Sequence, residues 1–372
     1  MLCPQKLGRC RDQAGVGLIE NPVIVGDLEA IAINDFVLHG KDDPAVALHG
    51  QGFWTWDTEE VFEMIKWMRA YNVDPEHAKK ILFYGFDMQA FDSAAKVALD
   101  ALATFEPSKV HKLRSRFKPL MSRNLWTSLR NVVERNWADL SDAVNDLVWD
   151  VEAHRDELVT KVRLEGYNTI HRHAVVARQC FEMLRGFYTQ PHSNRNWRDI
   201  AMAANVKWIA DRHPGQRIIA WAHNGHISKF GPSMGGQTMG SELDQLFGKE
   251  YVNFGFSFCQ GTLQAVNQPL SGAPPDWRFD LRTHRAAMAP RGSVGRTFAH
   301  TGIPIFAIDL RGAPDGGDIR TWFESPQPMR SVGSVYNERM ADSYFPPTAL
   351  LDHFDCMFFV ESTTCAVAMP PP

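Results

Sequence analysis

The sequence predicts an α/β fold in which a mainly parallel sheet is flanked by helices and carries a large all-helical insertion. Short apolar runs of strand length alternate with longer segments of helical spacing, a rhythm typical of parallel sheets covered on both faces. Residues 92–187 contain almost no Gly or Pro, and their charged residues alternate with Leu, Val, Trp and Ala at helical spacing. We therefore expect a sheet domain (27–91 and 191–372), a helical insertion (92–190) and an irregular N-terminal segment (1–26).

Two helices are expected at the start of the sheet domain. Residues 28–37 have apolar side chains at helical spacing, and Gly40 follows as a stop signal. Asp57 with Glu60 three residues later is close to a capping box, and acidic residues suit the positive end of a helix dipole. We expect this second helix to cover 61–71. Its expected buried residues are Val61, Ile65 and Met68.

The next apolar runs predict strands that end in polar side chains. Residues 80–88 indicate a strand with Asp87 near its end. A helix over 199–211 is followed by the short apolar run 217–222, which predicts a buried strand. Directly after it stands His223-Asn224-Gly225-His226, at the strand end where open α/β sheets bind ligands.

The C-terminal half continues the alternation of strands and helices. Two stretches rich in Gly, Pro and Ser, 231–240 and 269–296, are expected to be loops, and loops of such length inside a domain are often lids or binding loops. The remaining predicted elements are a short helix at 241–247 and strands at 251–258, 303–310 and 356–360.

Composition narrows the class of protein. The chain has 372 residues, enough for a large core, and its 39 Lys and Arg against 43 Asp and Glu leave a formal charge of −4. Such a balance argues against nucleic acid or a membrane surface as the main partner. The six cysteines form no C-x-x-C pair and the N-terminus has no signal-peptide pattern, so we expect a cytoplasmic protein with reduced thiols.

His223 and His226 are the leading candidates for chemistry. One imidazole could take a proton from water while the other polarises or protonates an oxygen, because both titrate near neutral pH. The alternative is structural, with ring N–H groups bonded to loop carbonyls, and the residues alone do not decide between the two. A His-x-x-His pair could also hold a metal, but no third ligand lies close in sequence, so we expect no metal and no cofactor.

Other candidates carry weaker signals. Residues 231–235 match the G-x-S-x-G nucleophile elbow by letter, but no strand directly precedes Ser233, so we treat the match as a decoy. Asp87 could orient a histidine or hold a substrate hydroxyl, and it could equally cap the next helix. The candidates for substrate contact, each of which could instead be plain core or surface, are Trp54, Trp56, Asn205 and Met239.

Several blocks, taken in order, resemble the erythromycin esterase-like family, and they extend from about residue 27 to the C-terminus. They lie at 32–38, 53–61, 67–72, 84–89, 196–205, 221–226 and 306–311. The resemblance implies a sheet-and-helix core with a helical insertion. It further implies hydrolysis of an ester, in some members a macrolide lactone, by activated water without a covalent serine intermediate. The A-H-N-x-H block supplies histidine to the family's site, and here it falls on His223 and His226.

One departure from the family pattern concerns the N-terminus. The family places its water-activating histidine in an early G-E-x-x-H-G-T block, followed by an arginine and then by a strand that ends in glutamate. No such block is found here, and Ile24 falls where the strand glutamate would stand. We therefore expect the chain to be truncated or altered at its N-terminus, with part of the site missing.

Two hypotheses from different classes follow. The first is a hydrolase of a small-molecule ester, with His226, His223 and Asp87 in its site and His226 the nearer to the chemistry. The second is a catalytically silent binding protein or pseudoenzyme of the same fold. A weaker third hypothesis, haem ligation by a pocket histidine, rests on analogy of fold alone. The oligomeric state cannot be predicted.

Overall fold

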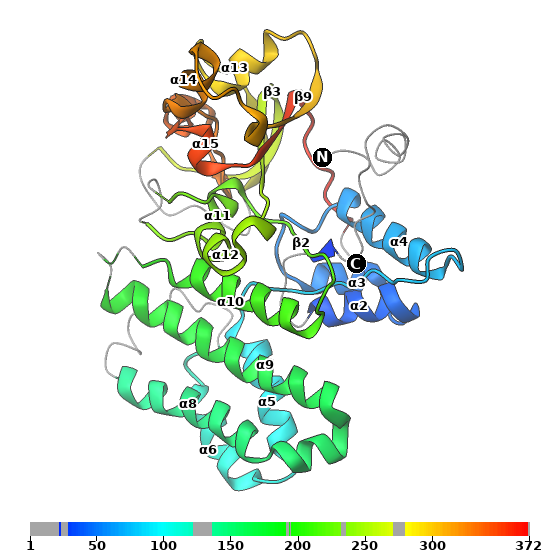
Figure 1. Cartoon of the computed structure of the whole chain (residues 1–372). Helices are drawn as coiled ribbons and strands as arrows, with labels where there is room; N and C mark the ends of the chain where they lie inside the picture. The colour runs from blue at the N-terminus through cyan, green and yellow to red at the C-terminus, as the bar shows by residue number, and fades with distance from the viewer. Residues whose placement is uncertain are drawn as a thin grey trace.

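A computed structural model describes residues 22–23, 29–121, 136–190, 193, 195–231, 236–270 and 280–370. Figure 1 shows three regions: a sheet with short helices, a small group of helices near the N-terminus, and a bundle of long helices on the opposite side from the sheet. The predicted irregular segment 1–26 lies outside the described residues except for Pro22 and Val23.

The small N-terminal group contains α2 (Glu29–His39), α3 (Pro44–Gly50) and α4 (Glu59–Val73), so the two helices predicted here are confirmed. Their shared core includes the three residues expected to be buried on α4. The cap of α4 differs from the prediction, because Thr58 accepts the N–H of Val61. Asp57 instead pairs with His49, whose Nδ1 lies 2.8 Å from Asp57 Oδ2.

The strand predicted over residues 80–88 does not form. This segment is extended, but side chains rather than a neighbouring strand hold its backbone. Asn72 accepts the N–H of Ile81 at 2.7 Å and donates to its carbonyl at 2.8 Å, while Asn34 accepts the N–H of Phe83 at 2.8 Å. The segment is apolar because Ile81, Phe83, Phe86 and Met88 are buried, so its sequence resembles a strand although the segment has no strand partner.

The bundle comprises α5 (Phe91–Leu102), α6 (Pro107–Phe117), α8 (Trp137–Ala153) and α9 (Arg155–Thr189), which form one hydrophobic cluster. This part of the chain is therefore helical, as the sequence predicts. The division of the chain into domains remains a prediction.

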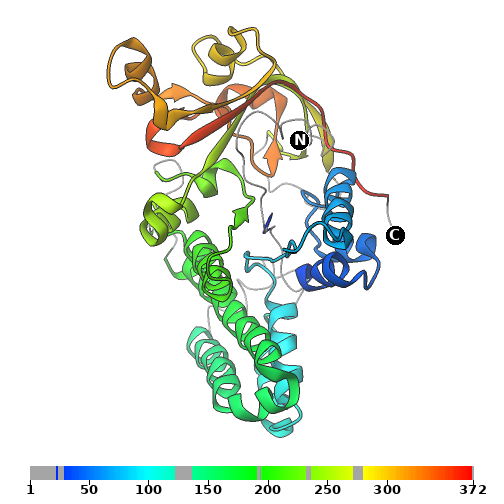
Figure 2. The same cartoon turned by 45° about the vertical axis from the view of Figure 1, so that its right-hand side comes forward.

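After the bundle, α10 (Trp197–Arg212) leads toward the histidine block. The predicted strand before that block is reduced to β2 (Ile219–Ala220), which pairs in parallel with β1 (Pro22–Val23). Two short helices follow, α11 (Asn224–Ile227) and α12 (Met239–Phe247). In Figure 1 and Figure 2 these helices lie between the bundle and the main sheet.

The main sheet is mixed, so the expectation of a mainly parallel sheet is not confirmed. Its order is β4-β3-β9-β5, with β7 also beside β3. The pairs β3–β9 and β3–β7 are parallel, whereas β3–β4 and β5–β9 are antiparallel. The strands are β3 (Phe254–Asn267), β4 (Leu281–Ala286), β5 (Ile305–Asp309), β7 (Val335–Tyr336) and β9 (Cys356–Thr363).

β4 occupies part of the predicted loop 269–296, of which residues 271–279 lie outside the described residues. This strand was not predicted because Arg282 and Arg285 interrupt its apolar pattern. β4 lies at the edge of the sheet, where charged side chains are common because they discourage pairing with another chain. The other short elements are η2 (Gly248–Glu250), α13 (Val294–Ala299), η3 (Leu310–Gly312), α14 (Asp318–Glu324), β6 (Gln327–Pro328), η4 (Glu338–Tyr344), β8 (Pro347–Thr348) and α15 (Leu350–His353).

Among the helices in the described ranges, none combines the length and the apolar character that crossing a membrane requires.

The support that Asn72 gives to the extended segment leads to a stability prediction. Asn72→Ala should lower the free energy of unfolding by about 2–3 kcal/mol, because it leaves the buried backbone N–H and carbonyl of Ile81 without their side-chain partner and removes one of two donors to the Val37 carbonyl. Urea unfolding would measure the change. The control is Lys66→Ala on the exposed side of the same helix, expected to stay within about 0.5 kcal/mol. Equal effects of both substitutions would contradict this role of Asn72.

Candidate functional site

The histidine block forms the turn into α11, and Asn224 attaches this turn to the main sheet. The Asn224 amide donates to the Phe256 carbonyl at 2.7 Å and accepts the Phe256 N–H at 3.0 Å. An asparagine side chain thus pairs with β3 as a neighbouring strand would. This pair of hydrogen bonds attaches the histidine turn directly to β3.

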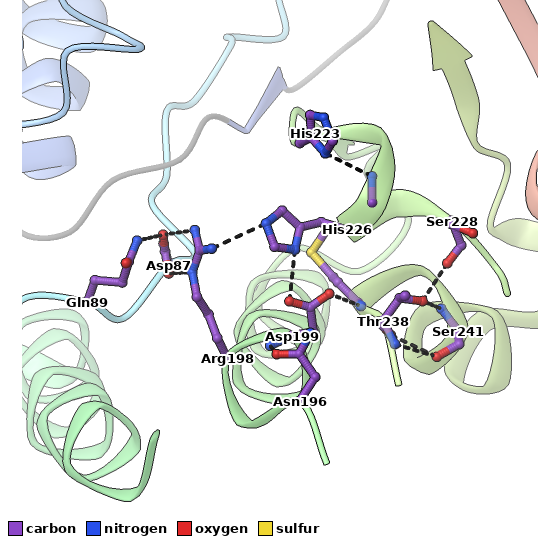
Figure 3. Close-up of polar contacts among 12 residues, drawn as sticks. Asp87, Gln89, Asn196, Arg198, Asp199, His223, His226, Ser228, Thr238 and Ser241 are labelled. Atoms are coloured by element: carbon purple, nitrogen blue, oxygen red, sulfur yellow. Dashed lines mark hydrogen bonds and ion pairs between the residues drawn. The ribbon is translucent and has the colours of Figure 1, made fainter. Parts of the chain in front are cut away.

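His226 is hydrogen-bonded to Asp199, as Figure 3 shows. Its Nδ1 lies 2.8 Å from Asp199 Oδ1, and the Asp199 side chain is 1% exposed. Asp199 Oδ2 accepts the N–H of Met239 at 2.9 Å. The carboxylate oxygen accepts a hydrogen from Nδ1 of His226, so in the neutral ring Nε2 carries the lone pair.

Arg198 lies between His226 and a second buried carboxylate. Its Nε and Nη2 donate to the two oxygens of Asp87 at 3.1 and 2.7 Å, a bidentate pair. Its Nη1 lies 3.2 Å from His226 Nε2, which accepts this hydrogen bond. Asp87 also accepts from the Gln89 amide at 2.7 Å and from the N–H of Met88 at 2.8 Å. Figure 3 shows these residues as one chain of polar contacts.

The charges of the Arg198–Asp87 pair support each other. Burial would raise the pKa of Asp87, but the Arg198 charge and the hydrogen bonds outweigh burial and hold that pKa below its usual value. Burial would likewise lower the pKa of Arg198, and Asp87 and Asp199 together raise it. Both groups are therefore ionised at neutral pH. A permanent cation thus lies next to the His226 lone pair.

His223 has a different environment from His226. Its Nδ1 accepts the N–H of Gly225 at 3.0 Å, so its hydrogen is on Nε2, which donates to the Val332 carbonyl at 3.1 Å. Although part of the residue is exposed, packing around the ring desolvates it, and together with His226 this lowers the pKa of His223. The structure joins His226, through Arg198, to Asp87, and His223 makes none of these contacts.

The four residues expected to contact substrate have different environments in the structure. Trp56 packs edge-on against Trp221, with 4.9 Å between ring centres, whereas Trp54 is half-buried. Asn205 is 2% exposed and donates to the Phe86 carbonyl at 2.7 Å, so the surface alternative for this residue is wrong. Met239 buries its side chain completely and reaches the site only through its N–H.

Sequence reasoning did not select Arg198 or Asp199 as site residues. Both stand in the first turn of α10, where Asn196 caps the helix by accepting the Asp199 N–H at 3.3 Å. An acidic residue at a helix start usually stabilises the helix itself, which hid the role of Asp199. The only signal in the sequence was their place in the block 196–205, part of the family resemblance.

Two further expectations fall partly or wholly outside the described residues. Residues 232–235, which include Ser233 of the G-x-S-x-G match, are not described. Residues 239–240 of the expected loop belong to α12. In the described ranges, no three His, Cys, Asp or Glu side chains gather closely enough to hold a metal ion.

Taken together, these contacts define a mixed α/β protein in which a half-buried histidine pairs with a buried carboxylate beside an arginine–carboxylate pair, an arrangement suited to proton transfer. Comparison of the sequence with protein families then identifies the particular group. Residues 27–363 match the erythromycin esterase family, and the chain belongs to it.

A curated relative and three solved structures are similar to this chain. The relative is a putative hydrolase, YbfO, of Bacillus subtilis (strain 168), with 24% identity over 281 residues, which span 66% of this chain and 60% of that protein. Each structure is aligned over 94% of this chain. A Bacillus cereus protein has 20% identity, a TM-score of 0.76 and 82% of its own chain aligned, and a succinoglycan biosynthesis protein has 19% identity, a TM-score of 0.74 and 81% aligned. A mutant of the erythromycin esterase EreC in its open conformation has 14% identity, a TM-score of 0.66 and 84% aligned.

These likenesses agree on the fold, because the structural matches cover nearly the whole described chain at identities too low to carry a function. The names of the family and of the curated relative suggest a hydrolase. Ester specificity does not follow from them.

The hydrogen bonds of the two histidines predict opposite tautomers. At neutral pH, His226 should carry its hydrogen on Nδ1 and His223 on Nε2, because each ring's partners require it. Long-range 1H–15N NMR of histidine-labelled protein distinguishes the two forms. Asp199→Ala should remove the preference at His226 and leave His223 unchanged. A shared Nε2–H tautomer in the unaltered protein would refute the proposed hydrogen bonding.

Stability should depend on pH through histidines whose pKa the fold lowers. In such a residue the unfolded chain binds the proton more readily, so stability is fully present above about pH 6.5 and is lost as the pH falls. We expect the free energy of unfolding to drop between pH 7.5 and 5.5 in urea unfolding, and the drop to shrink in His223→Gln. A pH-independent free energy would contradict this. The residues concerned are His173, His213, His223 and His353.

Proposed function

We propose that this protein is a hydrolase that cleaves a carboxylic ester with water activated by His226. The observation that carries the proposal is the pairing of half-buried His226 with buried Asp199, which turns the basic Nε2 of the ring toward a charged guanidinium. A neutral imidazole with a fixed tautomer is a competent general base near pH 7. The family and the putative hydrolase relative support the reaction class.

In this mechanism, Arg198 has two successive partners. In the structure its Nη1 donates to His226 Nε2. When a substrate carbonyl oxygen enters beside Arg198, the guanidinium can donate to that oxygen instead, which frees Nε2 to accept a hydrogen from water. Asp87 holds the rest of the guanidinium by its bidentate contact, so only a small movement of Nη1 is needed.

The reaction balances without a covalent intermediate on the protein. The water oxygen bonds to the carbonyl carbon while its proton passes to His226 Nε2. The carbonyl electron pair moves onto oxygen, and Arg198 stabilises that negative charge, as preorganised cations do in acyl transfer. The oxyanion then re-forms the carbonyl and expels the alkoxide, which takes the proton back from His226. The products are a carboxylic acid, ionised at neutral pH, and an alcohol.

Asp199 and Asp87 have separate roles in this scheme. Asp199 fixes the ring and stabilises the imidazolium that forms during the reaction. Asp87 keeps Arg198 charged and oriented. Trp221 stands two residues before His223 and packs against Trp56. This aromatic pair is proposed to line the apolar side of the substrate site. The proposed substrates are small-molecule esters, among them macrolide lactones, in keeping with the family name and the structural likeness to EreC.

The roles of His226 and Asp199 give a direct test. We expect His226→Ala to lower kcat/KM by about 10²–10⁴-fold, because it removes the general base. Asp199→Asn should lower it by about 10²-fold or more, because the tautomer is no longer fixed. Hydrolysis of p-nitrophenyl acetate and of erythromycin would be followed by absorbance and by mass spectrometry.

The matched control is His171→Ala. This histidine also pairs with a carboxylate, Glu152 at 2.9 Å, but on the surface of the helical bundle, so activity should be unchanged. Comparison with His223→Ala reports which histidine of the block acts in the reaction. Ligand binding without turnover in the unaltered protein, retained by His226→Ala, would instead support the non-catalytic alternative.

A further inference from the structure

Residues 364–369, here called the strap, join the main sheet to α4. The strap follows β9, and Figure 2 shows it in red, passing from the sheet to the blue N-terminal helices. At its start, the N–H of Cys365 donates to the hydroxyl of Thr262 on β3 at 2.8 Å. Within the part of the chain that the structure describes, no helix of the N-terminal group packs extensively against a strand of the main sheet. The strap is therefore a principal link between the two.

At its other end, the strap pairs with the turn that precedes α4 (residues 53–58). The N–H of Glu59 donates to the Val367 carbonyl at 2.8 Å. The N–H of Met369 donates to the Asp57 carbonyl at 3.1 Å, and the two bonds form a short antiparallel bridge. The first N–H groups of a helix have no partner within the helix, so the strap supplies an acceptor that α4 itself cannot provide.

Side chains reinforce this pairing. Glu60, in the first turn of α4, accepts the Val367 N–H at 3.2 Å on each of its carboxylate oxygens. Met369 packs against the hydrophobic cluster of the N-terminal group, and Trp56 and Trp221 pack against the same cluster. The end of the strap therefore shares its packing with the aromatic pair that is proposed to line the substrate site.

Trp56 stands directly before the residues that the strap holds. Its carbonyl accepts the N–H of Thr58 at 2.8 Å, and Thr58 is 1% exposed. Between these two residues, Asp57 contacts the strap through its carbonyl and His49 on α3 through its side chain. The turn that carries Trp56 is therefore fixed between α3 and the strap.

We propose that the strap positions Trp56 and thereby sets the apolar side of the substrate site. The effect on substrate rests on the proposed hydrolysis, whereas the effect on Trp56 does not. Val367 and Met369 are positioning residues, because they contact the turn before α4 and not the reacting groups. The part of the ester concerned is its apolar body, since aromatic rings offer mainly carbon surface for contact.

Steady-state hydrolysis of p-nitrophenyl butyrate tests the effect on substrate. Met369→Ala removes the apolar end of the strap, and Val367→Pro removes the N–H that Glu60 accepts. We expect each to raise KM about fivefold or more and to leave kcat within about twofold, because the binding lost is common to the ground state and the transition state. An unchanged KM in both folded variants overturns the proposal.

The matched control is Val367→Ala. It keeps the backbone N–H and changes only a side chain that is 51% exposed. Its KM and kcat should therefore equal those of the unaltered protein. A KM raised as much by Val367→Ala as by Val367→Pro would contradict the role of the backbone pairing.

Fluorine NMR of the Trp56 ring supplies a readout that does not depend on turnover. The protein is labelled with 5-fluorotryptophan, and Trp56→Phe assigns the resonance. We expect Met369→Ala and Val367→Pro to shift or broaden this resonance and Val367→Ala to leave it in place, because only the first two loosen the turn before α4. A resonance that both variants leave unmoved overturns the proposal.

The two readouts separate this proposal from the proposed function. If the unaltered protein hydrolyses no ester, the proposed function fails, and the fluorine resonance alone decides whether the strap holds Trp56. Glu60→Ala is a milder variant for the case in which Val367→Pro does not fold, and it should also shift the resonance. Its control is Glu63→Ala, on the next turn of α4, where Glu63 pairs with Lys66 at 2.5 Å. Equal effects of the two glutamate substitutions would refute the strap contact.

Discussion

The carboxylate of Asp199 is the constraint on which the candidate site depends. One oxygen receives the His226 hydrogen and the other receives the first N–H of α12, so a single buried group joins α10, α11 and α12. A carboxyl group can be buried at this depth because both oxygens have donors and one lies at the positive end of a helix. Removing either donor would leave a buried charge partly unpaired. The pairing therefore fixes the relative positions of all three helices.

The close approach of α12 to α11 depends on a missing side chain. At Gly240, a Cβ atom would lie 2.1 Å from the Ile227 carbonyl oxygen and 2.3 Å from that of Ser228. No larger residue fits without moving the backbone. The N-terminus of α12 therefore lies close enough to Asp199 for the Met239 N–H to reach it. The glycine at position 240 is thus a condition for the hydrogen bond between Met239 and Asp199.

Asparagine side chains make backbone hydrogen bonds that neighbouring strands make in a regular parallel sheet. Asn224 pairs with β3, Asn72 with the backbone of Ile81, and Asn205 with the carbonyl next to Asp87. Each asparagine gives backbone groups the hydrogen bonds that a neighbouring strand would supply in a regular sheet. Arg198 completes this arrangement by attaching Asp87 to the start of α10. The histidine turn is thus held from several directions by hydrogen bonds rather than by one continuous ladder.

The sequence by itself determined the helices of the bundle, the helix α4 with its buried face, and the placement of two histidines in a turn after an apolar run. These features depend on periodicity and local turn signals, which neighbouring residues decide. Only the tertiary structure decided that residues 80–88 lack a strand partner, that the sheet is mixed, and that Arg198 and Asp199 rather than His223 contact His226. Such contacts join residues that lie 27 or 111 positions apart, as in His226–Asp199 and Arg198–Asp87. No local pattern specifies which distant carboxylate a side chain will meet, because that choice is made by the packing of whole helices.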